Sequence, residues 1–211
     1  MVLTPFNGCM LSHEPGLGKT LTSSCIMQAA KYHITSEKHV RKPCLVVCPR
    51  NLLVRWATSE LPKFFDREYL SFCTYHKYSL GNEEKKTLNQ YDKNVKHLER
   101  FDVILTTYNT IQSEMKYLLR HYETVHQHAF ADATILPLVQ KHILKKGARN
   151  DVPMSKSGLQ PPDVKLLSID FFTTICNKAY TLRGQQSLMF VAVNNIRTRK
   201  RVLLTGSPFS L

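Results

Sequence analysis

The chain has 211 residues, and its 29 lysines and arginines against 16 acidic residues leave a formal charge of +13. Its apolar content of 43% is enough to bury a core, which excludes a disordered or fibrous chain, and a single domain is expected at this length. No apolar run approaches the roughly 18 residues of a membrane span, and the first residues lack a signal-peptide pattern. The charge indicates an anionic partner without distinguishing nucleic acid from acidic protein or lipid.

The cysteines are scattered along the chain without a CxxC pair, mostly inside apolar runs. This usage favours free thiols, mostly buried, in a protein of a reducing, intracellular compartment. The six residues are Cys9, Cys25, Cys44, Cys48, Cys73 and Cys176.

The first part of the chain alternates helical and strand-like patterns. A strand-like start leads to a glycine-containing loop, which a helical pattern follows at 19–33. The apolar run 44–49 (CLVVCP) predicts a buried strand, because it does not alternate polar and apolar residues. A helix is expected at 51–65, with Asn51 as its N-cap and Trp56 as a core anchor.

Two charged segments interrupt this alternation in the middle of the chain. Residues 81–100 carry many charges and few apolar anchors, which predicts an exposed helix. A second buried strand is expected at 101–106 and a helix at 110–126. Residues 133–165 contain several prolines and glycines, with six Lys or Arg against two Asp, which predicts a basic loop or insertion within one domain.

The last part of the chain returns to the strand and helix pattern. Strands are expected at 171–176 and 202–205, with a helix at 186–196 between them. Strands that alternate with helices form a parallel sheet with right-handed crossovers. The predicted fold class is therefore α/β, a parallel sheet flanked by helices.

The glycine-containing loop has the pattern of a phosphate-binding loop. Gly16 and Gly18 permit the unusual dihedral angles that point backbone N–H groups inward, and the following helix contributes its positive end. Lys19 is expected to reach the β- and γ-phosphates of a nucleotide, and the Thr20 hydroxyl to ligate Mg²⁺. The general pattern places a glycine at position 13, where this chain has His13. The candidate loop comprises Glu14, Pro15, Gly16, Leu17, Gly18, Lys19 and Thr20.

Four segments together resemble the Swi/Snf-type, helicase-like ATPases that act on DNA or chromatin. SHEPGLGKTL (12–21) is similar to the first motif of that family, and CLVVCPRNLLVRWATSELPKF (44–64) to the next. FDVILTTYNTIQSE (101–114) resembles its DVVLTTY segment, and KRVLLTGSPF (200–209) the LLTGTP motif that ends the first lobe. The resemblance implies that residues 1–211 form the N-terminal RecA-like P-loop lobe, which binds ATP with Mg²⁺, contacts DNA and resides in the nucleus.

One motif of the family departs from its pattern here. The family places DEAH about 29 residues before the glycine of LLTGTP, and 29 positions before Gly206 lies Asn177, in TICNKAYTLRG. Asn177 and Lys178 then replace the Asp and Glu of DEAH. A competing register uses Asp170 as the acid at the strand end, but its spacing differs and no Glu follows it.

The two replacements predict binding of ATP with little or no hydrolysis. Asn177 keeps the shape of the aspartate that the resemblance associates with Mg²⁺ but lacks its charge. The Lys178 side chain is a cation near neutral pH and does not accept a proton from the attacking water, whereas loss of a general base costs roughly 10²–10⁴-fold in rate. Lys178 could instead pair with the γ-phosphate. Alternatively, a neighbouring acid could substitute for the lost pair.

The resemblance also implies nucleic-acid contacts and a missing partner lobe. Catalysis in this family needs a second RecA-like lobe with an arginine finger, and the sequence given ends directly after LLTGSPF. The alternatives are a fragment of an active DNA-translocating ATPase, an ATPase that obtains its second lobe from another chain, and a non-enzymatic copy that docks on partners. Strand-end residues suited to phosphate contacts, for which a purely structural loop role is the alternative, are Arg50, Asn51, Thr106, Thr107 and Tyr108.

Overall fold

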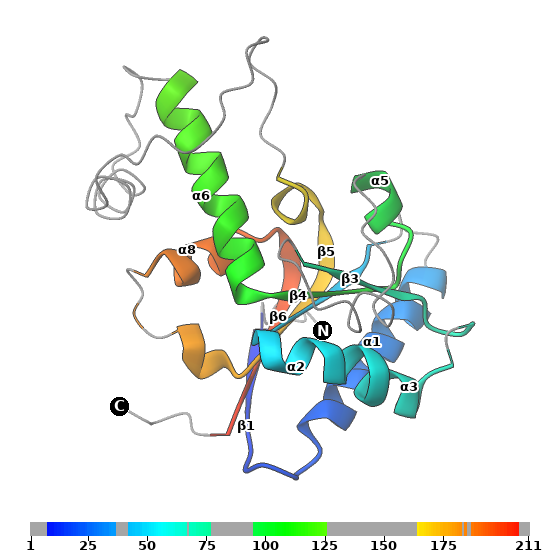
Figure 1. Ribbon diagram of the computed structural model, residues 1–211. Coiled ribbons are helices and arrows are strands. Elements are labelled where there is room, and N and C mark those ends of the chain that lie inside the picture. The colour runs from blue at the N-terminus through cyan, green and yellow to red at the C-terminus, as the bar shows by residue number, and fades with distance from the viewer. Residues whose placement is uncertain are drawn as a thin grey trace, which may run out of the picture.

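The computed structural model describes residues 8–36, 42–66, 68–76, 95–125, 164–182, 184 and 187–206. Six parallel strands form one sheet in the order β1-β6-β5-β2-β4-β3 (Figure 1). This arrangement confirms the predicted α/β class. The strands are β1 Gly8–Ser12, β2 Cys44–Cys48, β3 Phe72–Tyr75, β4 Val103–Thr107, β5 Phe171–Asn177 and β6 Thr198–Thr205.

Four of the strands lie at the four apolar runs, and a fifth, β1, at the strand-like start. The residues of β2 and β4 are buried throughout, as expected for strands that are covered on both faces. The strand β3, whose four residues are all buried, was not among the predicted strands. This strand pairs with β4 from Phe72, opposite Val103, to Tyr75, opposite Thr106.

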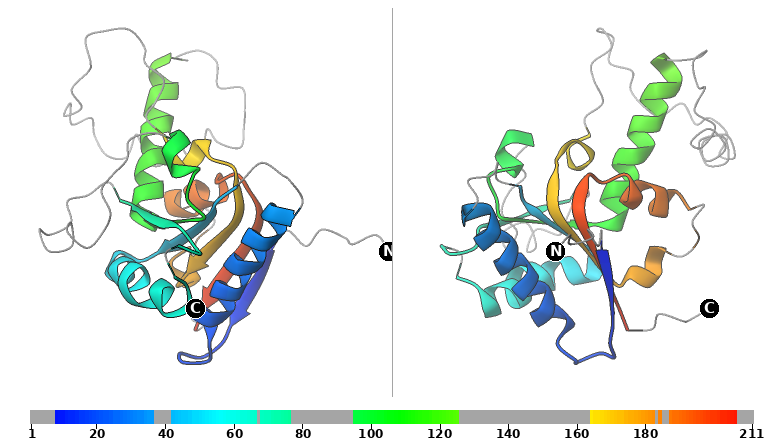
Figure 2. Two further views of the ribbon diagram at one scale, coloured as in Figure 1. Left: turned by 90° about the vertical axis from the view of Figure 1, so that its right-hand side faces the viewer. Right: turned by 180° about the vertical axis from the view of Figure 1, so that it is seen from behind.

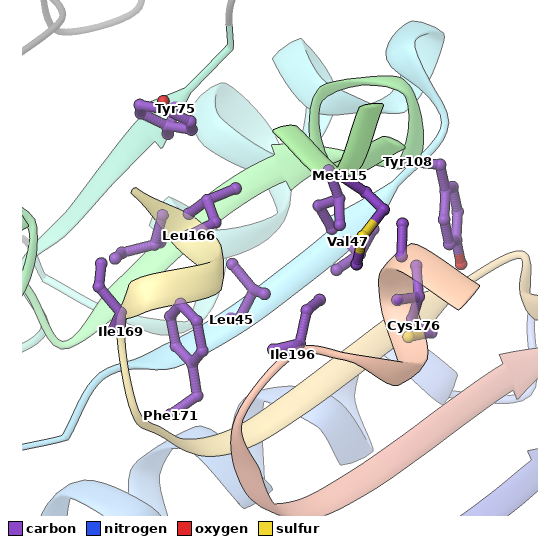
Figure 3. Close-up of a cluster of buried hydrophobic side chains, with 14 of the residues drawn as sticks. Leu45, Val47, Tyr75, Tyr108, Met115, Leu166, Ile169, Phe171, Cys176 and Ile196 are labelled. Carbon is purple, nitrogen blue, oxygen red and sulfur yellow. The ribbon is translucent and has the colours of Figure 1, made fainter. Parts of the chain in front are cut away.

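Helices cover both faces of the sheet (Figures 1 and 2). One apolar cluster joins the sheet to α1 and to the segment from α2 to α3, and includes Met27, Leu53, Trp56 and Leu61. A second cluster joins the opposite face to α6 and α8, and Figure 3 draws its side chains. The helices are α1 Lys19–Ser36, α2 Arg50–Arg55, η1 Trp56–Glu60, α3 Leu61–Phe64, α5 Val95–Leu98, α6 Tyr108–Val125, η2 Leu166–Ser168, η3 Ala179–Leu182 and α8 Leu188–Asn194.

The segment after β2 differs in detail from the expected helix. Its helical residues begin at Arg50 with Pro49 in the N-cap position, and no side chain caps this end. The prediction that Asn51 is the N-cap is therefore wrong, because Asn51 lies within the first turn. The segment also passes through a π-helical turn at Trp56–Glu60. Trp56 is 2% exposed, which confirms it as a core anchor.

The edge strand β1 is held close to β6. Gly8 lies opposite Arg201, and a Cβ atom at Gly8 would come within 2.3 Å of the Arg201 carbonyl oxygen. A side chain at this position would therefore push the two strands apart. On the other side, the Arg201 guanidinium donates to the backbone carbonyls of Val193, Asn194 and Ile196 at the end of α8. Cationic groups at a helix C-terminus satisfy carbonyls that lack helical partners.

Two of the predicted segments lie mainly outside the described residues. Of the helix expected at 81–100, the structure describes α5 and the turn after it. The expected basic insertion at 133–165 falls outside the described residues except for its last two positions. Among the described helices, none combines the length and the apolar character that a membrane crossing requires.

Candidate nucleotide-binding site

The loop between β1 and α1 contains two glycines in the left-handed backbone region, which the predicted phosphate-binding loop requires. Gly16 and Gly18 have φ angles of 90° and 74°, a region that side chains disfavour. The 18-residue α1 begins directly after them, so its unpaired N-terminal N–H groups face the loop. Lys19 folds back, and its Nζ donates to the carbonyls of His13 and Glu14 at 2.5 and 2.6 Å.

His13 does not need the conformational freedom of glycine. Among the described non-glycine residues, the positive φ angle recorded is that of Lys178, so the backbone at His13 lies in an ordinary region. The departure of this chain from the general phosphate-loop pattern therefore leaves the loop geometry intact. Two glycines, Gly16 and Gly18, are enough to turn this loop.

The carboxyl ends of the parallel strands bring distant segments to the same edge of the sheet. β6 lies between β1 and β5, with Thr205 opposite Ser12 and Leu204 opposite Asn177. At Gly206 the chain reaches the phosphate loop, since an added Cβ atom would lie 3.6 Å from Pro15 Cδ. Because ligands of open α/β sheets bind at the carboxyl ends of the strands, this edge is the candidate site.

The two candidate positions for the degenerate acid lie at opposite ends of β5. Asn177 is the last residue of the strand, and Lys178 follows it at the carboxyl edge. Asp170 precedes the first residue of the strand, where it pairs with Lys42 and Arg197 at 3.3 and 3.2 Å. Of the two candidate residues, only Asn177 therefore lies at the same edge of the sheet as the phosphate loop.

Lys178 has an unusual backbone conformation, with a φ angle of 57°. Its carbonyl oxygen accepts hydrogen bonds from the backbone N–H and the hydroxyl of Thr181, both at 3.0 Å. The half-buried side chain extends toward Tyr180, whose ring centroid lies 5.9 Å from Nζ. Tyr180 was not predicted as a neighbour of this ammonium group, although it lies only two residues from Lys178 in the sequence.

Tyr108 links the end of β4 to the end of β5. Its hydroxyl donates to the Asn177 carbonyl at 2.8 Å, and its side chain is 3% exposed. Burial raises the pKa of Tyr108 well above its usual range, so the hydroxyl stays protonated and remains a donor. The hydrogen bond fixes the backbone directly before Lys178.

The hydroxyl groups expected to contact nucleic acid point into the protein. Thr106 donates to the Tyr75 carbonyl at 2.8 Å, and Thr107 lies 3.3 Å from His76 Nδ1 and 2.9 Å from the Thr110 hydroxyl. Both threonines are at most 1% exposed. This geometry matches the alternative, structural role, and phosphate contacts by these side chains stay a prediction that the internal bonds do not favour.

Arg50 and Asn51 are placed differently from these threonines. Both are exposed and lie in the first turn of α2, directly after the carboxyl end of β2. They therefore face the same edge of the sheet as the phosphate loop. Of the five candidate nucleic-acid contacts, these two have side chains that a large anionic ligand can reach.

A parallel sheet in this order, with a glycine loop after β1 leading into α1, defines a single RecA-like lobe of the P-loop class. The family model of the SNF2-related domain matches residues 3–210. The chain therefore belongs to the SNF2-related (Swi/Snf-type) ATPase family.

The curated relatives are much longer than this chain. It is 24% identical to the human transcriptional regulator ATRX over 205 residues, which cover 97% of the chain and 7% of that protein. It is 24% identical over 203 residues to the RAD54-like DNA repair and recombination protein of Drosophila persimilis, covering 96% of the chain and 19% of the relative. A chromodomain-helicase-DNA-binding protein 1-like relative of Danio rerio is 33% identical over 111 residues, 53% of the chain and 10% of the relative.

A solved structure gives the same fold. The Sulfolobus solfataricus SWI2/SNF2 ATPase core in complex with dsDNA matches with a TM-score of 0.54 at 23% identity. The match covers 96% of this chain and 28% of the solved one. At this identity the comparison supports the fold, a RecA-like lobe.

Proposed function

We propose that the chain binds ATP at the loop from Glu14 to Thr20. The observation that carries this proposal is the loop conformation: two glycines at positive φ lead into a long helix, with the Lys19 ammonium held across the loop by two carbonyls. Backbone N–H groups, a helix N-terminus and a lysine together favour a polyphosphate. Lys19 exchanges its two carbonyl partners for phosphate oxygens when the nucleotide binds.

We also propose that bound ATP is hydrolysed slowly or not at all. Asn177 and Lys178 follow each other at the end of β5, and neither side chain is a general base near neutral pH. The rival proposal is that the chain is part of an active DNA-translocating ATPase. Hydrolysis would then need both a substitute acid and a second lobe. A non-enzymatic copy that docks on partners is distinguished by having no affinity for ATP.

Magnesium, which the family implies, does not fit the residues present. The half-buried Thr20 hydroxyl in the first turn of α1 is one candidate ligand. Hard cations prefer carboxylates, but the described strand end beside the loop supplies a neutral amide at Asn177 and a cation at Lys178.

The test of ATP binding compares Lys19→Ala with Lys200→Ala by isothermal titration calorimetry. Lys200 is an exposed lysine near the amino end of β6, away from the loop, and serves as the matched control. Loss of a charge-assisted contact to phosphate is expected to weaken ATP binding by about tenfold or more at Lys19, with no change at Lys200. Equal affinities of wild type and Lys19→Ala would contradict the proposal, and so would rapid turnover by the wild-type chain with DNA added.

We propose DNA as a second ligand of the same edge, contacted through Arg50 and Asn51 in a nuclear protein. The support is their exposure at the end of β2 and the dsDNA named for the Sulfolobus solfataricus structure. Phosphate contacts of this kind make affinity depend on salt rather than on sequence. Fluorescence anisotropy with a DNA duplex is expected to show weaker binding and a shallower salt dependence for Arg50→Ala. An unchanged salt dependence contradicts this role.

A further inference from the structure

We propose that this site holds ATP without a divalent cation, because the ammonium group of Lys178 neutralises phosphate charge that a metal ion otherwise neutralises. The inference rests on the proposed ATP binding and goes further, since it names the charge state of the ligand. The reason is that the end of β5 carries a neutral amide and a cation, Asn177 and Lys178, instead of the carboxylates that magnesium prefers.

The sheet register brings Lys178 within reach of a nucleotide held by the loop. Asn177 lies beside Leu204 on β6, and β6 lies beside β1, whose last residue Ser12 leads into the loop. Neighbouring strands are about 4.8 Å apart, so two strand spacings separate Asn177 from the start of the loop by about 10 Å. A triphosphate extending from the loop and a lysine on its flexible four-carbon stem together span such a gap.

The backbone holds Lys178 in a defined place at this edge. The Tyr108 hydroxyl fixes the Asn177 carbonyl at 2.8 Å, and Thr181 fixes the Lys178 carbonyl from the other side with two hydrogen bonds. The side chain is left with a weak contact, its Nζ lying 5.9 Å from the Tyr180 ring centroid. A cation held over a ring at a half-exposed position gains little from that contact, so a phosphate competes for it readily.

The charges at this edge favour a metal-free polyphosphate. Lys19 and Lys178 supply two positive charges, and in the described part of the chain neither forms an ion pair with a carboxylate. The described residues also contain no group of three histidines, cysteines or acids that could hold a metal ion. At the end of β5 a magnesium ion would meet the ammonium of Lys178 instead of a carboxylate, and like charges repel.

The experiment measures the affinity of the full chain for ATP by isothermal titration calorimetry, once in excess magnesium chloride and once in EDTA. The proposal expects ATP to bind in EDTA at least as tightly as in magnesium. Binding in magnesium with none in EDTA overturns the inference and leaves the proposed ATP binding intact. Absence of binding under both conditions overturns the proposed function and this inference together.

Substitutions at the strand end test the role of Lys178 directly. Lys178→Glu is expected to weaken ATP binding in EDTA by about tenfold or more, since an attraction becomes a repulsion. The double variant Asn177→Asp, Lys178→Glu is expected to bind ATP in magnesium and to lose that binding in EDTA. Unchanged affinity of Lys178→Glu in EDTA overturns the inference and leaves Tyr180 as the sole partner of this ammonium group among the described residues.

Two controls separate charge at the site from folding and from net charge. Lys200→Glu makes the same change of charge on β6, where Lys200 precedes Thr205 by five residues and so lies about 16 Å from it along the strand. The affinity of this variant for ATP is expected to stay within about twofold of wild type, since surface charges beyond a Debye length are screened. Lys178→Gln keeps the length of the side chain without its charge. If Lys178→Glu fails to fold, as judged by thermal melting, a loss of affinity of Lys178→Gln in EDTA carries the same conclusion, and no loss overturns it.

Discussion

Glu114 ties the long helix α6 to the segment that leads into β5. Its side chain is 0% exposed, and its Oε2 accepts hydrogen bonds from the backbone N–H groups of Leu166 at 2.9 Å and Leu167 at 3.3 Å. These are the first two residues of η2, whose end is followed closely by β5. Glu114 therefore supplies an acceptor to a helix start that no N-cap side chain serves.

Glu114→Ala is expected to destabilise the fold through these two donors. A buried donor that loses its partner costs about 1–3 kcal/mol. Leu166 is fully buried and its bond is short, whereas the bond of Leu167 is longer and partly buried. The expected loss in free energy of unfolding is therefore about 3 kcal/mol, and Glu114→Gln, which keeps a carbonyl acceptor, is expected to lose about 1 kcal/mol.

Urea unfolding followed by circular dichroism measures this difference. A loss of 3 kcal/mol corresponds to a fall of about 1–2 M in the midpoint at ordinary denaturant slopes. Glu99→Ala makes the same substitution at an exposed glutamate and is expected to change stability by less than about 0.5 kcal/mol. A loss below about 1 kcal/mol for Glu114→Ala would refute the reasoning, because two donors would then have been left unpaired at almost no cost.

The backbone at Lys178 and the burial of the thiols lead to three further predictions. Lys178 has a φ angle of 57°, which glycine adopts readily and β-branched residues do not. In urea unfolding, Lys178→Gly is therefore expected to raise the free energy of unfolding by up to about 1 kcal/mol, and Lys178→Val to lower it by about 1 kcal/mol or more. Equal stabilities of the two variants would contradict the strained conformation. Thiol labelling of the native chain is expected to modify the exposed Cys9 and Cys25 and to spare the other four cysteines, which are buried. Because burial raises the pKa of these four thiols from 9.0 to about 12, the unfolded chain loses these protons first between pH 9 and 12. Stability, unaffected by these thiols below pH 9, then falls by about 1.4 kcal/mol per pH unit for each thiol, and a flat stability profile over this range would contradict their burial.

The strand and helix pattern was readable because buried parallel strands leave a strong signal. Apolar runs such as 44–49 and 101–106 are covered on both faces, so their composition alone predicts strands. The strand β3 was not predicted because it has only four residues and gains its strand character from pairing with β4. Short segments whose conformation depends on a distant partner carry little local signal.

The candidate site was predictable in its residue types but not in the orientation of its side chains. The pattern of Gly16, Gly18 and Lys19 indicated a phosphate loop, and the structure has the expected glycine conformations. The sequence did not reveal that Thr106 and Thr107 turn their hydroxyls into the protein. That orientation depends on acceptors on β3 and α6, which tertiary packing brings together.

The sequence by itself determined the α/β class and the family and predicted the phosphate loop, because these depend on local periodicity and on motifs that are contiguous in the chain. It also places Asn177 and Lys178 where the family resemblance implies two acidic residues, and this exchange contributes to the charge of +13. Only the tertiary structure decided that Asn177, and not Asp170, lies at the edge of the phosphate loop. The physical reason is the strand order: β6 inserts between β1 and β5, so residues more than 150 positions apart share one edge only when the sheet has formed.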